Sequence, residues 1–367
     1  MTNTDFRVAV FEGDGIGAEI TAPTLRLMDR AAARVGGLSF TWQPCLAGAQ
    51  TYLDEGVALP KASLEAAAAA DAILLAAMGD PSIRYPDGRE LTPQIELRME
   101  LGLYAGVRPV KPIPGVRTVL ADPRAAEMDF VILRESTEGL FAPQAPGTRD
   151  GDREARETLV ITRAVSEKLF DFAFRLAETR AAARGRPGKV TCVDKANVFQ
   201  AFAFFRGIFE ERAARHPGVA TEAAYVDAFA MTMALKPWTI DVAATENMFG
   251  DILSDLGAAL MGGMGYAPSA DIGDMHAVFQ PCHGSAPDIA GKGLANPTAM
   301  ILSAAMMLDW LGDRHGVAEA GRAGSLLRRA VEASFAGGDL VTCELGGAAG
   351  TAEVFARVGE TLERLDA

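Results

Sequence analysis

The stretch TENMFGDILSD, residues 245–255, decides how the rest of this sequence is interpreted. We predict that it is helical, and its Asp251 and Asp255 stand four positions apart, so both carboxylates lie on one helix face. Carboxylate oxygens at this spacing suit one divalent cation. A solvated acidic face is the alternative for such a pair taken alone, and other motifs of the chain distinguish the two.

The composition is that of an ordinary globular protein with room for two or three domains, since the 367 residues are 49% hydrophobic and 23% charged. A net charge of -13, without a long run of Arg or Lys, argues against nucleic-acid binding, because phosphates attract cationic surfaces. We therefore expect small-molecule partners.

Localisation signals are also missing from the sequence. No apolar run approaches the length of about 18 residues that a membrane span needs, and no signal peptide precedes the first expected strand. Cys45, Cys192, Cys282 and Cys343 have no paired spacing, so neither disulfides nor a zinc site is expected. These features predict a cytoplasmic protein that does not cross a membrane.

Short apolar runs alternate with longer amphipathic or alanine-rich segments, which predicts an α/β fold. A charged loop is expected at 149–156, and a glycine-rich segment at 257–293 is expected to approach a ligand closely. The expected strands cover residues 6–11, 38–42, 73–77 and 130–133, and the expected helices cover 17–35, 162–183 and segments that begin near Asn296 and Gly350.

The motif GDGIGAE, residues 13–19, follows a predicted strand and satisfies the glycine pattern of a dinucleotide-binding Rossmann fold. That fold needs an acidic residue at the end of the next strand, where this chain has Gln43 and Pro44. Asp14 would also place a carboxylate beside the pyrophosphate. We therefore interpret the motif as a structural glycine turn.

Three arginines, Arg98, Arg108 and Arg134, stand at the edges of apolar elements rather than in charged runs. A guanidinium binds a carboxylate through two parallel hydrogen bonds, so three that converge would suit a di- or tricarboxylate, although each alone is typical of a surface ion pair. Lys195 in VDKAN follows a predicted strand, and Asp227 in YVDAFAM ends a strand or opens a helix. A lysine in a partly buried polar site can accept a proton near neutral pH.

Together these motifs resemble the β-decarboxylating dehydrogenases, the family of isocitrate, isopropylmalate, homoisocitrate and tartrate dehydrogenases. The resemblance spans nearly the whole chain, and its most specific parts are TENMFGDILSD and HGSAPDIAGKGLANPTAMILSAAMM at 283–307, which is most similar to 3-isopropylmalate dehydrogenases. It implies a bilobal α/β/α fold unlike a Rossmann fold. Residues 1–103 and 262–367 would form a cofactor-binding domain, and residues 104–261 a domain for dimerisation and substrate binding.

The resemblance implies an NAD-dependent oxidative decarboxylation carried out by a homodimer with shared active sites. Mg²⁺ or Mn²⁺ would bind Asp251, Asp255 and Asp227 of the partner subunit, oxygen ligands that suit hard cations. Lys195, also from the partner subunit, would help to take the substrate's hydroxyl proton. The three arginines would hold the carboxylates, of which one leaves as carbon dioxide.

For the cofactor, the loop 283–296 resembles the adenosine pocket of the family. A carboxylate at Asp288 would accept hydrogen bonds from both ribose hydroxyls and repel a 2′-phosphate, which favours NAD over NADP. A helix-capping aspartate is the alternative for this position. The cofactor-binding residues implied by the resemblance are His283, Gly284, Ser285, Ala286, Asp288, Ile289, Asn296 and Glu344, the last at a position where relatives often carry aspartate.

Two positions bear on the reaction and the substrate. Phe141, seven residues after Arg134, stands where the family usually has a tyrosine that helps to protonate the enolate, and phenylalanine has no proton to give. Gln94 stands where isopropylmalate enzymes use a leucine, and burying an amide against an isopropyl group would cost about 1–3 kcal/mol. A 3-isopropylmalate-like acid is the default substrate, with isocitrate, tartrate and D-malate as alternatives.

An alternative of another class is a non-catalytic regulatory subunit of a hetero-oligomeric dehydrogenase. Such chains typically lose the lysine, the arginines or the metal-binding aspartates, all of which are present here. Phe141 is the one feature in its favour. The sequence therefore predicts an active enzyme.

Overall fold

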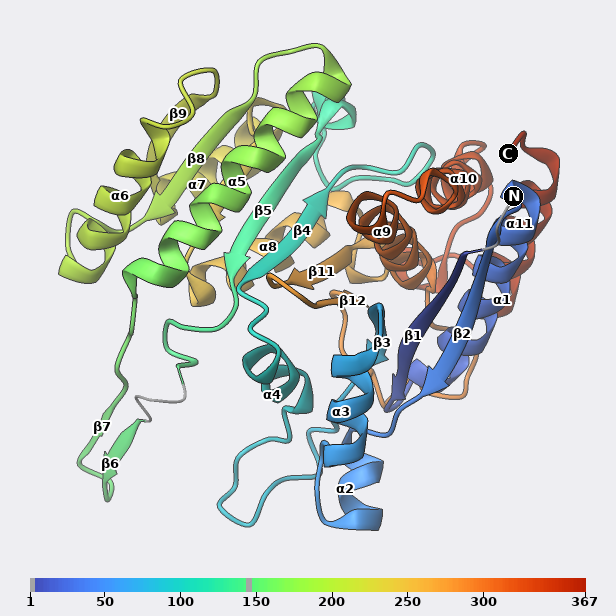
Figure 1. Cartoon of the computed structure of the whole chain (residues 1–367), viewed down its shortest axis with the longest axis horizontal. Helices are drawn as coiled ribbons and strands as arrows, with labels where there is room; N and C mark the ends of the chain where they lie inside the picture. The colour runs from blue at the N-terminus through green and yellow to red at the C-terminus, as the bar shows by residue number, and fades with distance from the viewer. Residues whose placement is uncertain (1–3, 143–146) are drawn as a thin grey trace. The chain divides into compact units, whose positions relative to one another are not determined.

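The alternating apolar and amphipathic segments fold into two units, each with its own set of strands and helices (Figure 1). The computed structural model describes residues 4–142 and 147–367. Unit 1 comprises Met1–Leu101, Ile113–Arg117 and Met261–Ala367, and unit 2 comprises Gly102–Pro112 and Thr118–Leu260. The cofactor-binding and dimerisation roles that the sequence assigns to 1–103 with 262–367 and to 104–261 stay predictions.

Unit 1 contains a mixed sheet in the order β2-β1-β3-β12-β11. All its neighbouring strands run parallel except β11 and β12, which are antiparallel. The strands are β1 (Thr4–Gly13), β2 (Leu38–Pro44), β3 (Ala72–Ala77), β11 (Pro268–Ile272) and β12 (Ala277–Pro281). The helices are α1 (Gly17–Val35), α2 (Ala49–Glu55), α3 (Lys61–Ala69), α4 (Pro93–Glu100), α9 (Thr298–His315), α10 (Ala318–Phe335) and α11 (Thr351–Arg364), with short 3-10 helices at Met264–Tyr266 and Cys343–Leu345.

Two layers of helices lie on one face of these strands. Helix α1 packs on β1, β2 and β3, and α9 packs on β3, β11 and β12, while α10 and α11 pack on α1 or α9 from outside. In Figure 1, α1 and α11 lie side by side near β1 and β2. Every residue of β3 is buried, which explains why its sequence, AILLAA, is apolar throughout instead of alternating.

The main strands of unit 2 follow the order β4-β5-β10-β8-β9, in which only β4 and β5 pair antiparallel. Helix α5 packs on β5, β8 and β10, and α6 packs on α5 and β8. The strands are β4 (Ala105–Val110), β5 (Phe130–Glu135), β6 (Thr148–Asp150), β7 (Glu154–Arg156), β8 (Lys189–Asp194), β9 (Ala220–Tyr225) and β10 (Val242–Thr245). The helices are α5 (Arg163–Arg184), α6 (Gln200–Ala213), α7 (Val226–Leu235) and α8 (Asn247–Met261, whose last residue belongs to unit 1), with 3-10 helices at Pro123–Glu127 and Pro237–Thr239.

The predicted α/β class is confirmed, and in neither unit do the strands follow the order of a Rossmann fold. The charged loop expected at 149–156 is wrong, because this segment carries the antiparallel hairpin of β6 and β7. Both strands are three residues long and fully exposed, so they lack the apolar alternation that identifies a strand in a sequence.

The structure supports the interpretation of GDGIGAE as a structural turn. Gly13 has φ of 67°, and a Cβ atom there would lie 1.7 Å from the carbonyl oxygen of Ala77, so only glycine fits. The Asp14 carboxylate accepts hydrogen bonds from the backbone N–H groups of Ala49 (2.8 Å), Gln50 (3.1 Å) and Gly79 (2.7 Å). Asp14 therefore ties the turn to the start of α2 and to the end of β3.

Two general expectations can be compared with the structure. Cys45, Cys192, Cys282 and Cys343 are all free thiols. Within residues 4–142 and 147–367, no helix combines the length and the apolar character that crossing a bilayer requires.

We expect Asp14→Ala to lower the free energy of unfolding by about 2–4 kcal/mol, because it leaves several backbone N–H groups without their charged acceptor. Asp5→Ala is the control, since Asp5 is exposed and accepts hydrogen bonds from the hydroxyls of Ser39 and Thr41; we expect it to cost less than about 1 kcal/mol. Urea denaturation measures both, and equal effects would contradict the structural role of Asp14.

Candidate active site

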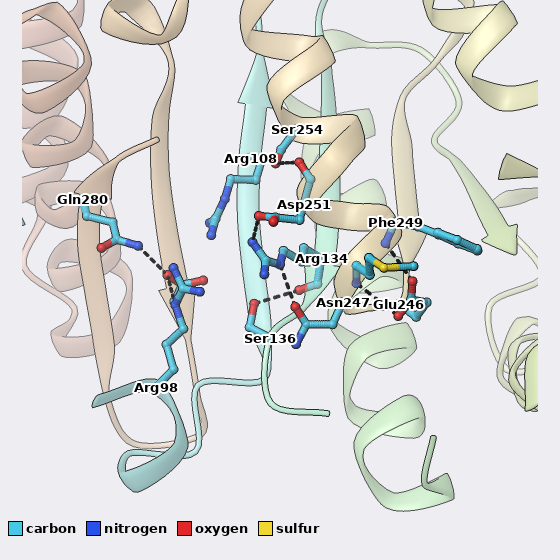
Figure 2. A network of polar contacts seen from close by, with 12 residues as sticks. Arg98, Arg108, Arg134, Ser136, Glu246, Asn247, Phe249, Asp251, Ser254 and Gln280 are labelled. Carbon is cyan, nitrogen blue, oxygen red and sulfur yellow. Dashed lines mark hydrogen bonds and ion pairs between the residues drawn. The ribbon is translucent and has the colours of Figure 1, made fainter. Parts of the chain in front are cut away.

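Helix α8 begins just after β10 ends, so its first residues lie at the carboxyl edge of the parallel strands of unit 2. The Glu246 carboxylate accepts hydrogen bonds from the N–H groups of Met248 (3.1 Å) and Phe249 (2.7 Å) and caps the helix (Figure 2). Asp251 and Asp255 follow on successive turns, which confirms the helix predicted for TENMFGDILSD.

The two aspartates of α8 interact electrostatically. Partial burial raises the pKa of Asp255, and the negative charge of Asp251 raises it further, while Arg134 and Arg108 act in the opposite direction. Across residues 4–142 and 147–367, no group of three or more His, Cys, Asp or Glu side chains is arranged to hold a metal ion. The metal site with Asp251, Asp255 and Asp227 of the partner subunit stays a prediction.

Arg134 is the penultimate residue of β5 and is buried beside the first turn of α8 (Figure 2). Its Nε donates a hydrogen bond to Oδ1 of Asn247 over 2.9 Å, and its Nη1 forms an ion pair with Asp251. The guanidinium carbon lies 5.5 Å from the centre of the Phe141 ring, within the range of a cation–π interaction. A predicted substrate arginine and a predicted metal ligand thus lie in direct contact.

Arg108 comes from the neighbouring strand β4 and is also buried. In the register of the two strands, Gly106 faces Arg134, so Arg108, two residues further on, lies on the same face of the sheet. The structure therefore brings Arg108 and Arg134 together in unit 2. Arg98 belongs to unit 1, and the predicted convergence of all three arginines stays a prediction.

Gly250 sets how closely α8 approaches β5. A Cβ atom on Gly250 would lie 2.6 Å from Cβ and 2.9 Å from Cα of Arg134, shorter than any normal contact. Any larger residue would push the helix away from the strand. The contact between Arg134 and Asp251 therefore depends on a glycine one residue before the aspartate.

Arg98 lies near the end of α4 in unit 1 and is held by two residues that the sequence did not suggest. Its Nε donates to Oδ2 of Asp271 on β11 over 3.0 Å, and Nε2 of Gln280 on β12 donates to the same oxygen over 3.0 Å (Figure 2). Gln94 stands one helical turn before Arg98, and its Oε1 is buried without a hydrogen-bond partner in the described part of the chain. A polar residue inside an otherwise apolar strand, as in PSADI, is the signal that could have identified Asp271.

Lys195 and Asp227 are also brought together, within one chain. The register of β8 and β9 pairs Asp194 with Tyr225, so the residues that follow both strands are neighbours. Lys195 Nζ lies 2.7 Å from Oδ1 of Asp227, and this hydrogen bond lowers the pKa of the aspartate. That the pair serves the partner subunit's site stays a prediction.

The predicted cofactor loop borders a cavity of about 370 Å³ in unit 1, lined by Ile16, Leu294 and other residues. Burial lowers the pKa of His283, so its ring is neutral at pH 7. Its Nδ1 lies 2.9 Å from the carbonyl oxygen of Gly284 and must carry the proton. The buried Nε2, which has no partner in the described residues, is then an acceptor that can receive a hydrogen bond from a ligand amino group.

Asn296 and Glu344 lie together on the wall of this cavity. Asn296 Nδ2 donates to Oε2 of Glu344 over 3.1 Å, and the N–H of Gly265 donates to its Oε1 over 3.1 Å. These contacts fix the carboxylate of Glu344, which the resemblance places among the cofactor-binding residues. Its acceptor oxygens are already partly used by the protein.

The remaining residues of the predicted cofactor loop have different surroundings. Ser285 is buried, and its backbone oxygen accepts a hydrogen bond from the N–H of Ile16 over 2.8 Å. Ala286 has φ of 40°, the only positive value at a non-glycine residue in the described part of the chain. Ala286 and Ile289 line the cavity, whereas Gly284 and Asp288 are exposed.

Comparisons with known proteins agree with this architecture. The family described as isocitrate/isopropylmalate dehydrogenase matches residues 7–358. A 3-isopropylmalate/3-methylmalate dehydrogenase of Methanocaldococcus jannaschii is 40% identical over 355 residues, which cover 96% of this chain and 98% of that protein. A probable tartrate dehydrogenase/decarboxylase of Bacillus subtilis is 35% identical, with 100% of both chains covered. The crystal structure of isocitrate dehydrogenase from Methylococcus capsulatus has a TM-score of 0.84 and 34% identity, covering 98% of this chain and 100% of that one.

These similarities define the chain as a decarboxylating dehydrogenase. It belongs to the isocitrate/isopropylmalate dehydrogenase family, as its motifs predicted. Dehydrogenases of this family generally use NAD(P) and a divalent metal, and the relatives act on small carboxylates. The alternative of a non-catalytic regulatory subunit is therefore not retained.

We expect Gly250→Ala to lower the free energy of unfolding by about 1–3 kcal/mol. Because the new methyl group displaces Arg134, we also expect kcat/KM to fall about tenfold or more. Gly207→Ala is the matched control: Gly207 lies in helix α6 with nothing within 4 Å of an added Cβ, so this change should stabilise the protein by about 0.5–1 kcal/mol. If both variants retained wild-type stability and kinetics, the close contact would not be required.

Proposed function

We propose that this chain is an NAD-dependent and divalent-metal-dependent enzyme that oxidatively decarboxylates a malate-type 2-hydroxy acid. The observation that carries the proposal is the contact of Arg134 with Asp251 beside Asp255. A guanidinium next to two carboxylates provides adjoining sites for a substrate carboxylate and a cation. A 3-isopropylmalate-like acid is the default substrate, and isocitrate, tartrate and D-malate are the alternatives.

The carboxylates of α8 fit a hard divalent cation, either Mg²⁺ or Mn²⁺. Carboxylate oxygens are the ligands that these ions prefer, and a cation would relieve the repulsion that raises the pKa of Asp255. Asp227 of the partner subunit would complete the set. When bound, the ion supplies a Lewis acid that polarises the hydroxyl and carboxylate oxygens of the substrate.

The other predicted residues have complementary roles in this proposal. Arg98, Arg108 and Arg134 bind the substrate carboxylates and orient the bond that breaks. Lys195 accepts the proton of the substrate hydroxyl during oxidation. Phe141 packs against Arg134 and has no proton to donate, so water or another group protonates the enolate.

NAD is the proposed hydride acceptor, held by the loop 283–296. The neutral Nε2 of His283 is an acceptor suited to the amino group of adenine. The exposed carboxylate of Asp288 suits two ribose hydroxyls and disfavours a 2′-phosphate. We therefore propose a preference for NAD over NADP.

A homodimer is proposed because unit 2 exposes large apolar side chains around α6, α7 and α8. Large apolar side chains exposed on several neighbouring helices are a feature of protein interfaces. The exposed side chains are Phe199 (54% exposed), Met231 (63%), Leu235 (67%) and Ile252 (62%).

The cysteines, which form no disulfide, also support the predicted cytoplasmic location, since a reducing compartment keeps thiols reduced.

One assay tests the proposed function. The purified chain is incubated with NAD, Mg²⁺ and, in turn, 3-isopropylmalate, isocitrate, D-malate and tartrate, while NADH and carbon dioxide are followed together. We expect both products in equal amounts, loss of activity with a chelator, and at least tenfold lower kcat/KM with NADP, since the repelled phosphate costs on the order of 1–2 kcal/mol.

Lys195→Met and Asp251→Asn are the matching variants, and each should lower kcat by about a hundredfold or more. Formation of NADH without carbon dioxide would refute decarboxylation and keep the dehydrogenase assignment. Full activity of Lys195→Met would refute the assigned proton acceptor.

Phe141 leads to a separate prediction about the last step of the proposed reaction, the protonation of the enolate. In D₂O, the wild type should add deuterium to the product carbon with little stereoselectivity, because protonation comes from solvent. Phe141→Tyr places a donor beside Arg134 and should make the uptake selective, as measured by NMR of a chiral derivative, whereas Phe141→Leu should not. Equal selectivity in all three proteins would show that the position is not a proton donor.

A further inference from the structure

The ion pair that holds Arg98 is more buried than a surface contact. Asp271 is 0% exposed and Arg98 is 9% exposed. In the register of β11 and β12, Asp271 faces Val278 and Ser269 faces Gln280, so Asp271 and Gln280 lie on one face as diagonal neighbours. The Gln280 amide therefore donates to Oδ2 of Asp271 from within the sheet.

The position of Gln280 is itself fixed. The backbone carbonyl oxygen of Gln280 accepts hydrogen bonds from the hydroxyls of Ser269 (2.7 Å) and Ser303 (2.9 Å). The Asp271 carboxylate accepts hydrogen bonds from Arg98 and from the Gln280 amide, and it cannot turn away from Arg98 without losing both. The negative charge beside Arg98 is a permanent part of unit 1.

A guanidinium has both a positive charge and several hydrogen-bond donors, and the contact with Asp271 affects the two differently. The contact with Asp271 uses Nε, and the terminal amino groups carry four further N–H donors. Arg98 thus keeps directed hydrogen-bond donors for a ligand, while the adjacent carboxylate offsets its positive charge. A ligand group bound there gains hydrogen bonds but little net electrostatic attraction.

Gln94 adds an independent observation on the same face of α4. It stands four residues before Arg98, and its buried Oε1 has no partner in residues 4–142 and 147–367. An amide oxygen is an acceptor, which attracts a donor or a neutral group rather than another carboxylate. Two features near Arg98 therefore disfavour additional negative charge.

We propose that the buried carboxylate of Asp271 sets the charge class of the substrate, so that the enzyme prefers dicarboxylate 2-hydroxy acids to tricarboxylates. The inference rests on the proposed function, in which Arg98 contacts the substrate. It assigns Asp271 as a positioning residue, because Asp271 acts through Arg98.

Asp271→Asn tests the proposal, because it keeps the shape and one acceptor oxygen but removes the charge. The readout is the ratio of kcat/KM for isocitrate, a tricarboxylate, to that for 3-isopropylmalate or D-malate, whichever the wild type uses better. We expect this ratio to rise about tenfold or more. A merely structural role would lower both values together and leave the ratio unchanged.

Two control variants separate charge from packing. Asp309→Asn removes a carboxylate from an ion pair with Arg328 on helices α9 and α10 of the same unit, and Gln280→Met removes the supporting amide but keeps the charge of Asp271. Both should change the ratio less than about twofold. If they change it as much as Asp271→Asn does, the proposal is overturned.

A measurement on the wild type covers the case in which Asp271→Asn does not fold. Succinate and tricarballylate are compared as competitive inhibitors, and we expect the third carboxylate to improve binding less than about threefold. A gain above tenfold, or a wild type more efficient with isocitrate than with every dicarboxylate, overturns the inference. A wild type that decarboxylates none of the substrates refutes the proposed function instead.

Discussion

The close approach of α8 to β5 is the constraint on which the site in unit 2 depends. Gly250 allows the helix to reach the backbone of Arg134, and the ion pair with Asp251 forms at that crossing. Asn247 joins the same contact from the first turn of the helix, since it accepts from Arg134 and donates to the carbonyl oxygen of Glu138 over 2.9 Å. The first turns of α8 therefore position Arg134 together with Asp251 and Asp255, the aspartates that we propose as cation ligands.

Several buried charged side chains in this protein are paired with side chains of opposite charge. Arg134 contacts Asp251, Arg98 contacts Asp271, and Asp194 accepts two hydrogen bonds of 2.8 Å from Arg206 just before Lys195. Removing one member of such a pair leaves an uncompensated charge, which is far more costly than replacing both. The pairs hold their side chains in fixed orientations, and catalytic sites gain from groups that need little reorganisation.

The sequence predicted the elements in which apolar or acidic residues recur at a regular spacing. The α/β class, helix α1 and the helical spacing of Asp251 and Asp255 follow from apolar patterns and residue spacing. The hairpin of β6 and β7 was missed because its exposed charged strands have no such pattern. Asp271 and Gln280 were missed for a different reason: their contact with Arg98 joins segments far apart in the chain, and spacing within one segment carries no information about it.

The backbone of the proposed cofactor loop has a consequence for the nucleotide binding that we propose there. Ala286 adopts φ of 40°, a conformation that costs a residue with a Cβ atom roughly 1 kcal/mol, so the surrounding contacts must hold it there. Ser285 supplies them through its bonds to Ile16 and to the carbonyl oxygen of Gly79. The loop has thus lost its freedom during folding, and an arriving nucleotide does not have to immobilise it again.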